Sequence, residues 1–208
     1  KPLIVADPRV TKTAMMADLF LPLSDMCDLA SPKGIGDILI CDGLIDRDYI
    51  EQHTNGFDEL RTFLEKYHPD YVSGITGLST EMIHQVAHLY GEAKSAFIGW
   101  TMGVNHSSKG TETVNAINNL ALMTGNVGRV GGSPFSITGQ CNAMGSREAS
   151  FSSSLPGYRK FESETDREDL ARLWDIPPGC IPPKRGRAYP DIITAVLTKK
   201  IRALWIIA

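Results

Sequence analysis

Two polar loops rich in glycine flank one predicted helix, at residues 112–124, and constrain this chain more than any other feature. The loops run through residues 99–110 and 124–147. Glycine lets a backbone approach a ligand closely. The amide side chains in the loops, which can both donate and accept hydrogen bonds, include Asn105, Asn126, Gln140 and Asn142. A single Gly-Asn or Gly-Gly pair is typical of a tight surface turn, but the two loops together favour a large polar ligand.

The start of the chain has the pattern of a parallel α/β sheet. Residues 3–6 and 19–23 are apolar and predict strands, with a short helix between them at residues 10–17. In parallel sheets, ligands bind at the carboxyl ends of the strands. Asp7, Arg9 and Asp28 follow these strands, so we expect them where a nucleotide would be recognised.

The rest of the chain alternates predicted helices with short strands. Helices are expected at residues 28–44, 46–53, 57–67, 80–94, 162–174 and 190–198, strands at 96–98 and 202–207, and a connector at 71–77. The fold class is therefore α/β. We expect a Rossmann-like parallel sheet domain over residues 1–139 and part of a second α/β domain over residues 140–208.

Charge and hydropathy exclude some classes of partner. The formal net charge of −3 argues against a nucleic-acid partner, which would favour a basic face. No apolar run approaches the length of a membrane span, and the chain opens without the pattern of a signal peptide. Both ends fall at apolar runs, so we expect a central fragment of a longer polypeptide.

No pattern of cysteine or histidine predicts a metal ligand. The cysteines, which show no C-x-x-C spacing, are Cys27, Cys41, Cys141 and Cys180. His84 and His88 lie four residues apart, as zinc ligands can, but Gln85 replaces the glutamate of an H-E-x-x-H motif. No third ligand is evident, so two solvated helix histidines are the favoured interpretation. Likewise, Gly34-Ile35-Gly36 is only a weak part of a dinucleotide fingerprint.

Four ordered segments resemble one known family. They are W-T-M-G-V-N-H-S-S-K-G-T at 100–111, N-L-A-L-M-T-G-N-V-G at 119–128, P-F-S-I-T-G-Q-C-N-A-M-G-S-R-E at 134–148 and, more weakly, A-D-P-R-V-T-K-T-A-M-M-A-D at 6–18. Together they resemble the molybdopterin oxidoreductases of the dimethyl sulfoxide reductase superfamily. Within it, the assimilatory nitrate reductase catalytic subunits are the most similar.

The resemblance implies a molybdenum-bis(molybdopterin guanine dinucleotide) cofactor. Asp7 and Arg9 match the family's D-P-R beside the guanosine diphosphate arm, although a structural Asp–Arg pair is the alternative. Asp28 matches a guanine-binding aspartate, although Met26-Cys27 replaces the family's Gly-Thr before it.

The resemblance also assigns the first glycine-rich loop to the pterin. Met102, Gly103 and His106 match an M-G-x-x-Q loop that wraps this group, with histidine in place of glutamine. Histidine keeps a donor and an acceptor, so the contact is expected to survive the exchange. Met102 is equally suited to filling a core.

Gln140 and Arg147 carry the expectation about substrate and are the candidate catalytic residues. Arginine suits a planar anion such as nitrate by its fork and permanent charge, and glutamine can orient an oxygen. The resemblance places the corresponding residues of the nitrate-reducing branch near molybdenum. The formate dehydrogenase branch carries arginine where this chain has Thr138. The alternative for Arg147 is a loop-ordering role.

The resemblance therefore implies a cytoplasmic nitrate reductase that forms nitrite by oxygen-atom transfer. Its partners would be nitrate, an electron-donor protein or domain, and the remainder of the same polypeptide. A 4Fe-4S cluster, with ligands outside this fragment, would carry the electrons, and the fragment alone would be inactive. The alternatives are another superfamily member, such as a formate dehydrogenase, or a non-catalytic scaffold related to the large subunit of complex I.

Overall fold

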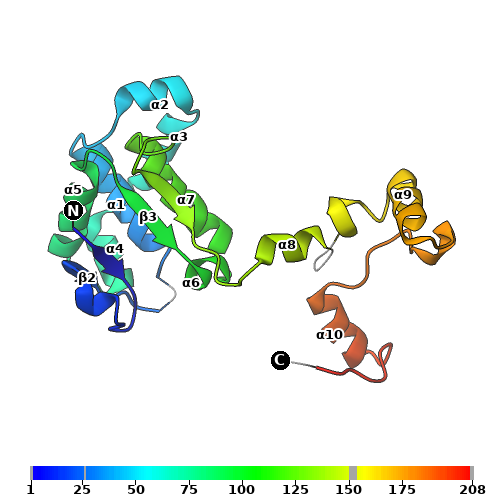
Figure 1. Ribbon diagram of the computed structural model, residues 1–208. Coiled ribbons are helices and arrows are strands. Elements are labelled where there is room, and N and C mark those ends of the chain that lie inside the picture. The colour runs from blue at the N-terminus through cyan, green and yellow to red at the C-terminus, as the bar shows by residue number, and fades with distance from the viewer. Residues whose placement is uncertain (1, 26, 150–153, 207–208) are drawn as a thin grey trace. The chain divides into compact units, whose positions relative to one another are not determined.

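The computed structural model divides the chain into two compact units, Lys1–Gly139 and Gln140–Ala208. It describes residues 2–25, 27–149 and 154–206 (Figure 1). The first unit contains both parallel strand pairs and most of the helices. In the described ranges, no helix combines the length and the apolarity needed to span a bilayer.

The first unit is built around helix α1 (Ala30–Cys41), which is buried from Ala30 to Leu39. A helix that is enclosed on every side belongs to a core. The helices that pack against it are α3 (Phe57–Leu64), α4 (Pro69–Thr76), α5 (Thr80–Gly91) and α7 (Gly110–Met123). A further helix, α2 (Arg47–His53), packs on α7 (Figure 1).

Local signals place several of these helices correctly. The Asp46 carboxylate accepts the Tyr49 N–H at 3.0 Å and caps α2, and the Ser79 hydroxyl accepts the Met82 N–H and caps α5. The predicted connector at residues 71–77 is wrong, because residues 71–76 belong to α4. Pro69 begins that helix, and Val72 is fully buried against α1, so tertiary packing stabilises a helix that its composition does not indicate.

The two glycines in the middle of α1 are packing residues. A Cβ atom at Gly34 would lie 2.8 Å from a methyl carbon of Val72 on α4. At Gly36 it would lie 3.1 Å from Leu64 on α3. The missing side chains therefore let two helices approach α1 closely. This packing explains the two glycines of Gly34-Ile35-Gly36, so no nucleotide-binding role is needed to explain them.

The strands pair in parallel, which confirms the predicted α/β class. Strand β1 (Ile4–Ala6) pairs with β2 (Leu19–Leu21), and β3 (Phe97–Trp100) pairs with β4 (Ser133–Ser136). Each pair forms its own two-stranded sheet. Between β1 and β2, the predicted helix is reduced to one 3₁₀ turn at Ala14–Met16.

The sequence did not indicate β4. Its residues read S-P-F-S within a glycine-rich stretch, and the proline at its second position lowers the strand tendency. Pairing with β3 stabilises this extended segment, with Gly99 opposite Phe135. A contact distant in sequence therefore decided the conformation.

A matched pair of glycine substitutions tests the packing of the first unit. A Cβ atom at Gly91, the last residue of α5, would lie 2.7 Å from Leu39 Cδ2 and 2.8 Å from Leu44 Cβ. We expect Gly91→Ala to lower the free energy of unfolding by about 1–3 kcal/mol, because it overfills a dense core. Gly74→Ala, inside α4, meets no atom within 4 Å and should be neutral or stabilising by up to about 1 kcal/mol. Urea unfolding followed by circular dichroism compares the two, and equal effects would contradict the packing argument.

The second unit contains short helices and one small core, to which α9 (Glu164–Trp174) and the segments on either side of it contribute. The helices are α8 (Ala143–Glu148), α9 and α10 (Tyr189–Leu197), with 3₁₀ turns at Pro156–Tyr158 and Pro178–Cys180. The core consists of Leu155, Leu170, Ala171 and Ile181. The strand predicted at residues 202–207 does not form over residues 202–206, where no described segment pairs with it; residue 207 lies outside the described residues.

Candidate functional site

The first glycine-rich loop follows β3, and residues 137–139 of the second loop follow β4. Because these strands are parallel neighbours, both segments leave the same edge of the sheet. The Ile137 N–H donates to the Trp100 carbonyl at 2.7 Å. A Cβ atom at Gly139 would lie 3.4 Å from Met102 Cγ. The structure therefore brings the Met102 loop next to the segment that leads into Gln140.

The Asn105 side chain ties the two loops together. Its Oδ1 accepts the Trp100 indole N–H at 2.9 Å, and its Nδ2 donates to the Ser136 hydroxyl at 2.9 Å. Each end of the amide thus has one partner inside the protein, and the two bonds link β3 to β4.

The amide side chain of Asn126, in the second loop, is 1% exposed. Its Oδ1 accepts the Ala96 N–H at 2.9 Å, and its Nδ2 donates to the Thr124 hydroxyl at 2.8 Å. The side chain thereby fastens the end of α7 to the residue before β3. A buried amide with its partners satisfied inside the protein is a core element.

Residues 102–106 present groups that remain available to a ligand. Met102 begins the short helix α6 (Met102–Asn105) and is half-buried. Gly103 is exposed, and a Cβ atom there would meet no atom within 4 Å. His106 is exposed at the end of α6. This surface can accept a ligand without rearranging the core.

Asp7 and Arg9 form a tight turn directly after β1. The Asp7 carboxylate accepts the Arg9 backbone N–H at 2.7 Å, a bond typical of an Asx-turn. Within the described ranges, no ion pair joins the two side chains, and the Asp7 carboxylate is bonded to the backbone of the turn. The Arg9 guanidinium is exposed and can reach an anion.

The other expected site residues, Asp28, Gln140 and Arg147, belong to other segments of the chain. Asp28 is half-buried between β2 and α1, on the segment that leaves the carboxyl end of β2. Gln140 and Arg147 belong to the second unit, and both are exposed. Arg147 lies in the last turn of α8, and none of the described side chains forms an ion pair with it.

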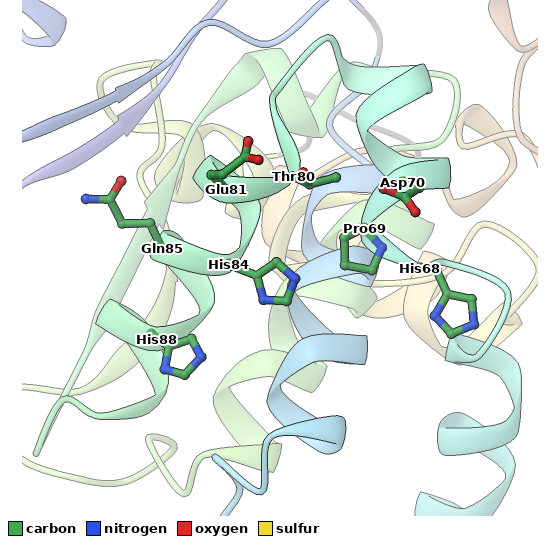
Figure 2. Close-up of a pocket in the computed structure, with 8 residues that line it drawn as sticks. All are labelled: His68, Pro69, Asp70, Thr80, Glu81, His84, Gln85 and His88. Atoms are coloured by element: carbon green, nitrogen blue, oxygen red, sulfur yellow. The ribbon is translucent and has the colours of Figure 1, made fainter.

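Sequence reasoning missed a pocket of about 760 Å³ on a different part of the first unit. Figure 2 shows the residues that line it, which come mainly from the start of α4 and from α5. They are His68, Pro69, Asp70, Thr80, Glu81, His84, Gln85 and His88. The spacing of His84 and His88 was the available signal, but nothing in the sequence indicated the residues beside them.

Buried and paired ionisable groups surround this pocket. The Asp37 carboxylate lies 3.2 Å from His68 Nδ1 and is 6% exposed. Burial raises the pKa of Asp37, and the His68 imidazole opposes part of that rise. Hydrogen bonds raise the pKa of His88, because the carboxylates that accept them favour its protonated form. The bond to Glu92 has the larger effect and the bond to Asp42 the next largest.

Comparison with known proteins identifies relatives of two activities. A nitrate reductase from Synechocystis sp. is 40% identical over 207 residues, which cover 99% of this chain and 29% of that protein. Formate dehydrogenase H from Escherichia coli is 33% identical over 205 residues, which cover 98% of this chain and 28% of that protein. The chain thus spans less than a third of the length of these relatives.

A solved structure and a family match agree with these relatives. Acetylene hydratase from Pelobacter acetylenicus superposes with a TM-score of 0.61 and 31% identity, covering 62% of this chain and 18% of that protein. Residues 49–207 match the molybdopterin oxidoreductase family. This match covers most of the chain and confirms the family that the loop motifs predict. The chain belongs to the molybdopterin oxidoreductase family.

Proposed function

We propose that the protein containing this chain is a molybdenum-dependent nitrate reductase that converts nitrate to nitrite. The observation that carries this proposal is the exposed Gln140 and Arg147 pair following Thr138, the position at which the formate dehydrogenase branch carries arginine. A nitrate reductase that is 40% identical to the chain supports the same assignment.

The residues at the strand ends fit a molybdopterin guanine dinucleotide. Asp7, Arg9 and Asp28 would hold its nucleotide arm, and residues 102–106 would contact the pterin through Met102, Gly103 and His106. The exposed Arg9 guanidinium suits a phosphate, since it can donate two parallel hydrogen bonds. When bound, the group supplies the redox-active metal centre for oxygen-atom transfer.

Arg147 and Gln140 would act on nitrate. The permanent positive charge of Arg147 attracts the anion and offsets part of the cost of removing it from water. Its fork can hold two oxygens of the planar anion, while the Gln140 amide donates to one oxygen and fixes its orientation.

Because this chain spans less than a third of the length of its relatives, we assign the remaining cofactor and partners to other parts of the polypeptide. We infer that a 4Fe-4S cluster and an electron-donor protein or domain serve the whole enzyme in the cytoplasm, with ligands and contacts in other parts of the polypeptide. The second unit exposes Leu197, Trp205 and Ile206, at 77%, 88% and 75%. Such large apolar side chains mark a surface that packs against another part of a protein, which suits the remainder of the same polypeptide.

Formate oxidation is the second candidate, because formate dehydrogenases are among the relatives. The two activities are separated by assaying the full-length, molybdenum-loaded enzyme with a viologen dye. We expect nitrate-dependent oxidation of the reduced dye, with kcat/KM exceeding that for formate-dependent dye reduction at least roughly a hundredfold. Preference for formate would overturn the proposal, and Arg147 would then have to act on a substrate other than nitrate. If neither substrate is turned over by enzyme with full molybdenum content, a third activity of the family or the scaffold alternative replaces both.

A further inference from the structure

Two histidines and one carboxylate form a cluster away from the proposed cofactor surface. His84 and His88 lie one turn apart on α5, and Asp42 is the cap residue that follows α1. One ligand atom from each lies within 4.8 Å of the other two. We propose that Asp42, His84 and His88 bind a divalent transition-metal ion, with Zn²⁺ as the best fit. Two imidazoles and a carboxylate are a donor set that zinc accepts.

The spacing of the ligand atoms suits coordination. His88 Nε2 lies 3.0 Å from Asp42 Oδ2. An ion with bonds of about 2.1 Å holds neighbouring ligands roughly 3–3.4 Å apart. The third atom, on the exposed His84 ring, can close the remaining gap by side-chain rotation alone. Figure 2 shows both rings projecting from the same helix.

A second carboxylate is placed to orient one of the ligands. His88 Nδ1 lies 3.0 Å from Glu92 Oε1, one turn further along the chain. If Nδ1 carries the proton and donates it in a hydrogen bond to Glu92 Oε1, the lone pair on Nε2 faces Asp42 and is free to bind metal. Histidine ligands in metal sites are commonly held in this way. Glu92 is therefore a positioning residue rather than a ligand.

The backbone positions of the ligands are fixed by the core. Next to the cluster, Gly91 packs so closely on Leu39 and Leu44 that the end of α5 is held against the end of α1. Ligands carried on packed helices keep their geometry better than ligands on loops. Three protein ligands leave at least one position for water or an external ligand, and the pocket beside His84 and His88 gives that ligand space.

The competing explanation is a network of ion pairs without metal. His88, when protonated, can donate to Asp42 and Glu92 at the observed distances. His84 is not part of such a network, because no hydrogen bond or ion pair joins its imidazole to any of the described residues. Coordination requires His84, so this residue distinguishes the two explanations.

Calorimetric titration of the full-length protein with Zn²⁺, after dialysis against metal-free buffer, tests the site. We expect a phase of one zinc ion per chain. His84→Ala and His88→Ala should each weaken that phase at least roughly a hundredfold, because each removes a ligand. Glu92→Gln should weaken it about 10–100-fold, the usual effect of losing an orienting partner. His53→Ala, which removes an exposed histidine outside the cluster, should leave the phase unchanged.

Zinc affinity unchanged in His84→Ala would overturn the proposal and leave an ion-pair network. A phase that survives in the His84→Ala/His88→Ala double variant would overturn it as well, as would the absence of the phase in the unaltered protein. Circular dichroism of each variant establishes that the fold is retained. Anomalous diffraction at the zinc edge, from crystals soaked in Zn²⁺, should give a peak between the three ligand atoms. Nitrate turnover does not enter this test, so its outcome is independent of the proposed function.

Discussion

Arg147→Ala in the full-length, molybdenum-loaded enzyme should lower kcat/KM for nitrate roughly ten- to a hundredfold. The physical reason is the loss of a charged hydrogen bond to the anion, worth about 1.5–3 kcal/mol. The structure leaves this guanidinium exposed at the end of α8, so truncating it should not disturb a core. Steady-state nitrate kinetics, with molybdenum content measured on the same samples, give the result.

A second variant at this position separates charge from geometry. Arg147→Lys keeps the positive charge but loses the planar fork. If attraction dominates, the lysine enzyme should retain much of its activity; if two oxygens must be held at once, it should fail nearly as badly as the alanine enzyme. Arg47→Ala on α2 removes the same charge from an exposed site in the first unit and serves as the control. Normal kcat/KM in fully loaded Arg147→Ala would leave Arg147 with only a structural role in α8.

Asn126→Ala should lower the free energy of unfolding by about 2–4 kcal/mol. The substitution leaves the Ala96 N–H without its acceptor and the Thr124 hydroxyl without its donor, and a buried polar group that loses its partner costs about 1–3 kcal/mol. The melting temperature should fall by roughly 5–15 °C, as expected for a domain of this size. Thermal and urea unfolding of the chain, followed by circular dichroism, measure both quantities.

Two comparison variants show whether the loss comes from the buried hydrogen bonds. Asn115→Ala removes an exposed amide from the middle of α7 and should be neutral or slightly stabilising. Asn126→Asp keeps an acceptor for Ala96 but places a charge in a buried site, so it should also destabilise. If Asn126→Ala unfolds like Asn115→Ala, the amide is not the link between α7 and β3 that its contacts indicate.

The sequence by itself determined the features that depend on neighbours in the chain. Asp46 and Ser79 cap their helices because a side-chain oxygen reaches an N–H group three residues on, which a sequence displays directly. The parallel pairing of β1 and β2 follows from a short crossover between two apolar runs. The ordered loop motifs likewise predicted the family, which the match over residues 49–207 confirms.

Tertiary structure decided the features that depend on residues far apart. In the sequence, the amides of Asn105 and Asn126 are equally suited to binding a ligand. In the structure, each one hydrogen-bonds to a residue that only folding brings close. The segment S-P-F-S forms β4 because it pairs with β3. Each residue of β3 lies 36 positions before its partner in the sequence. His84 and His88 gained a carboxylate neighbour, Asp42, because α1 and α5 pack together at their ends. Hydrogen bonds and packing contacts of this kind depend on distances in space, which local composition and spacing do not encode.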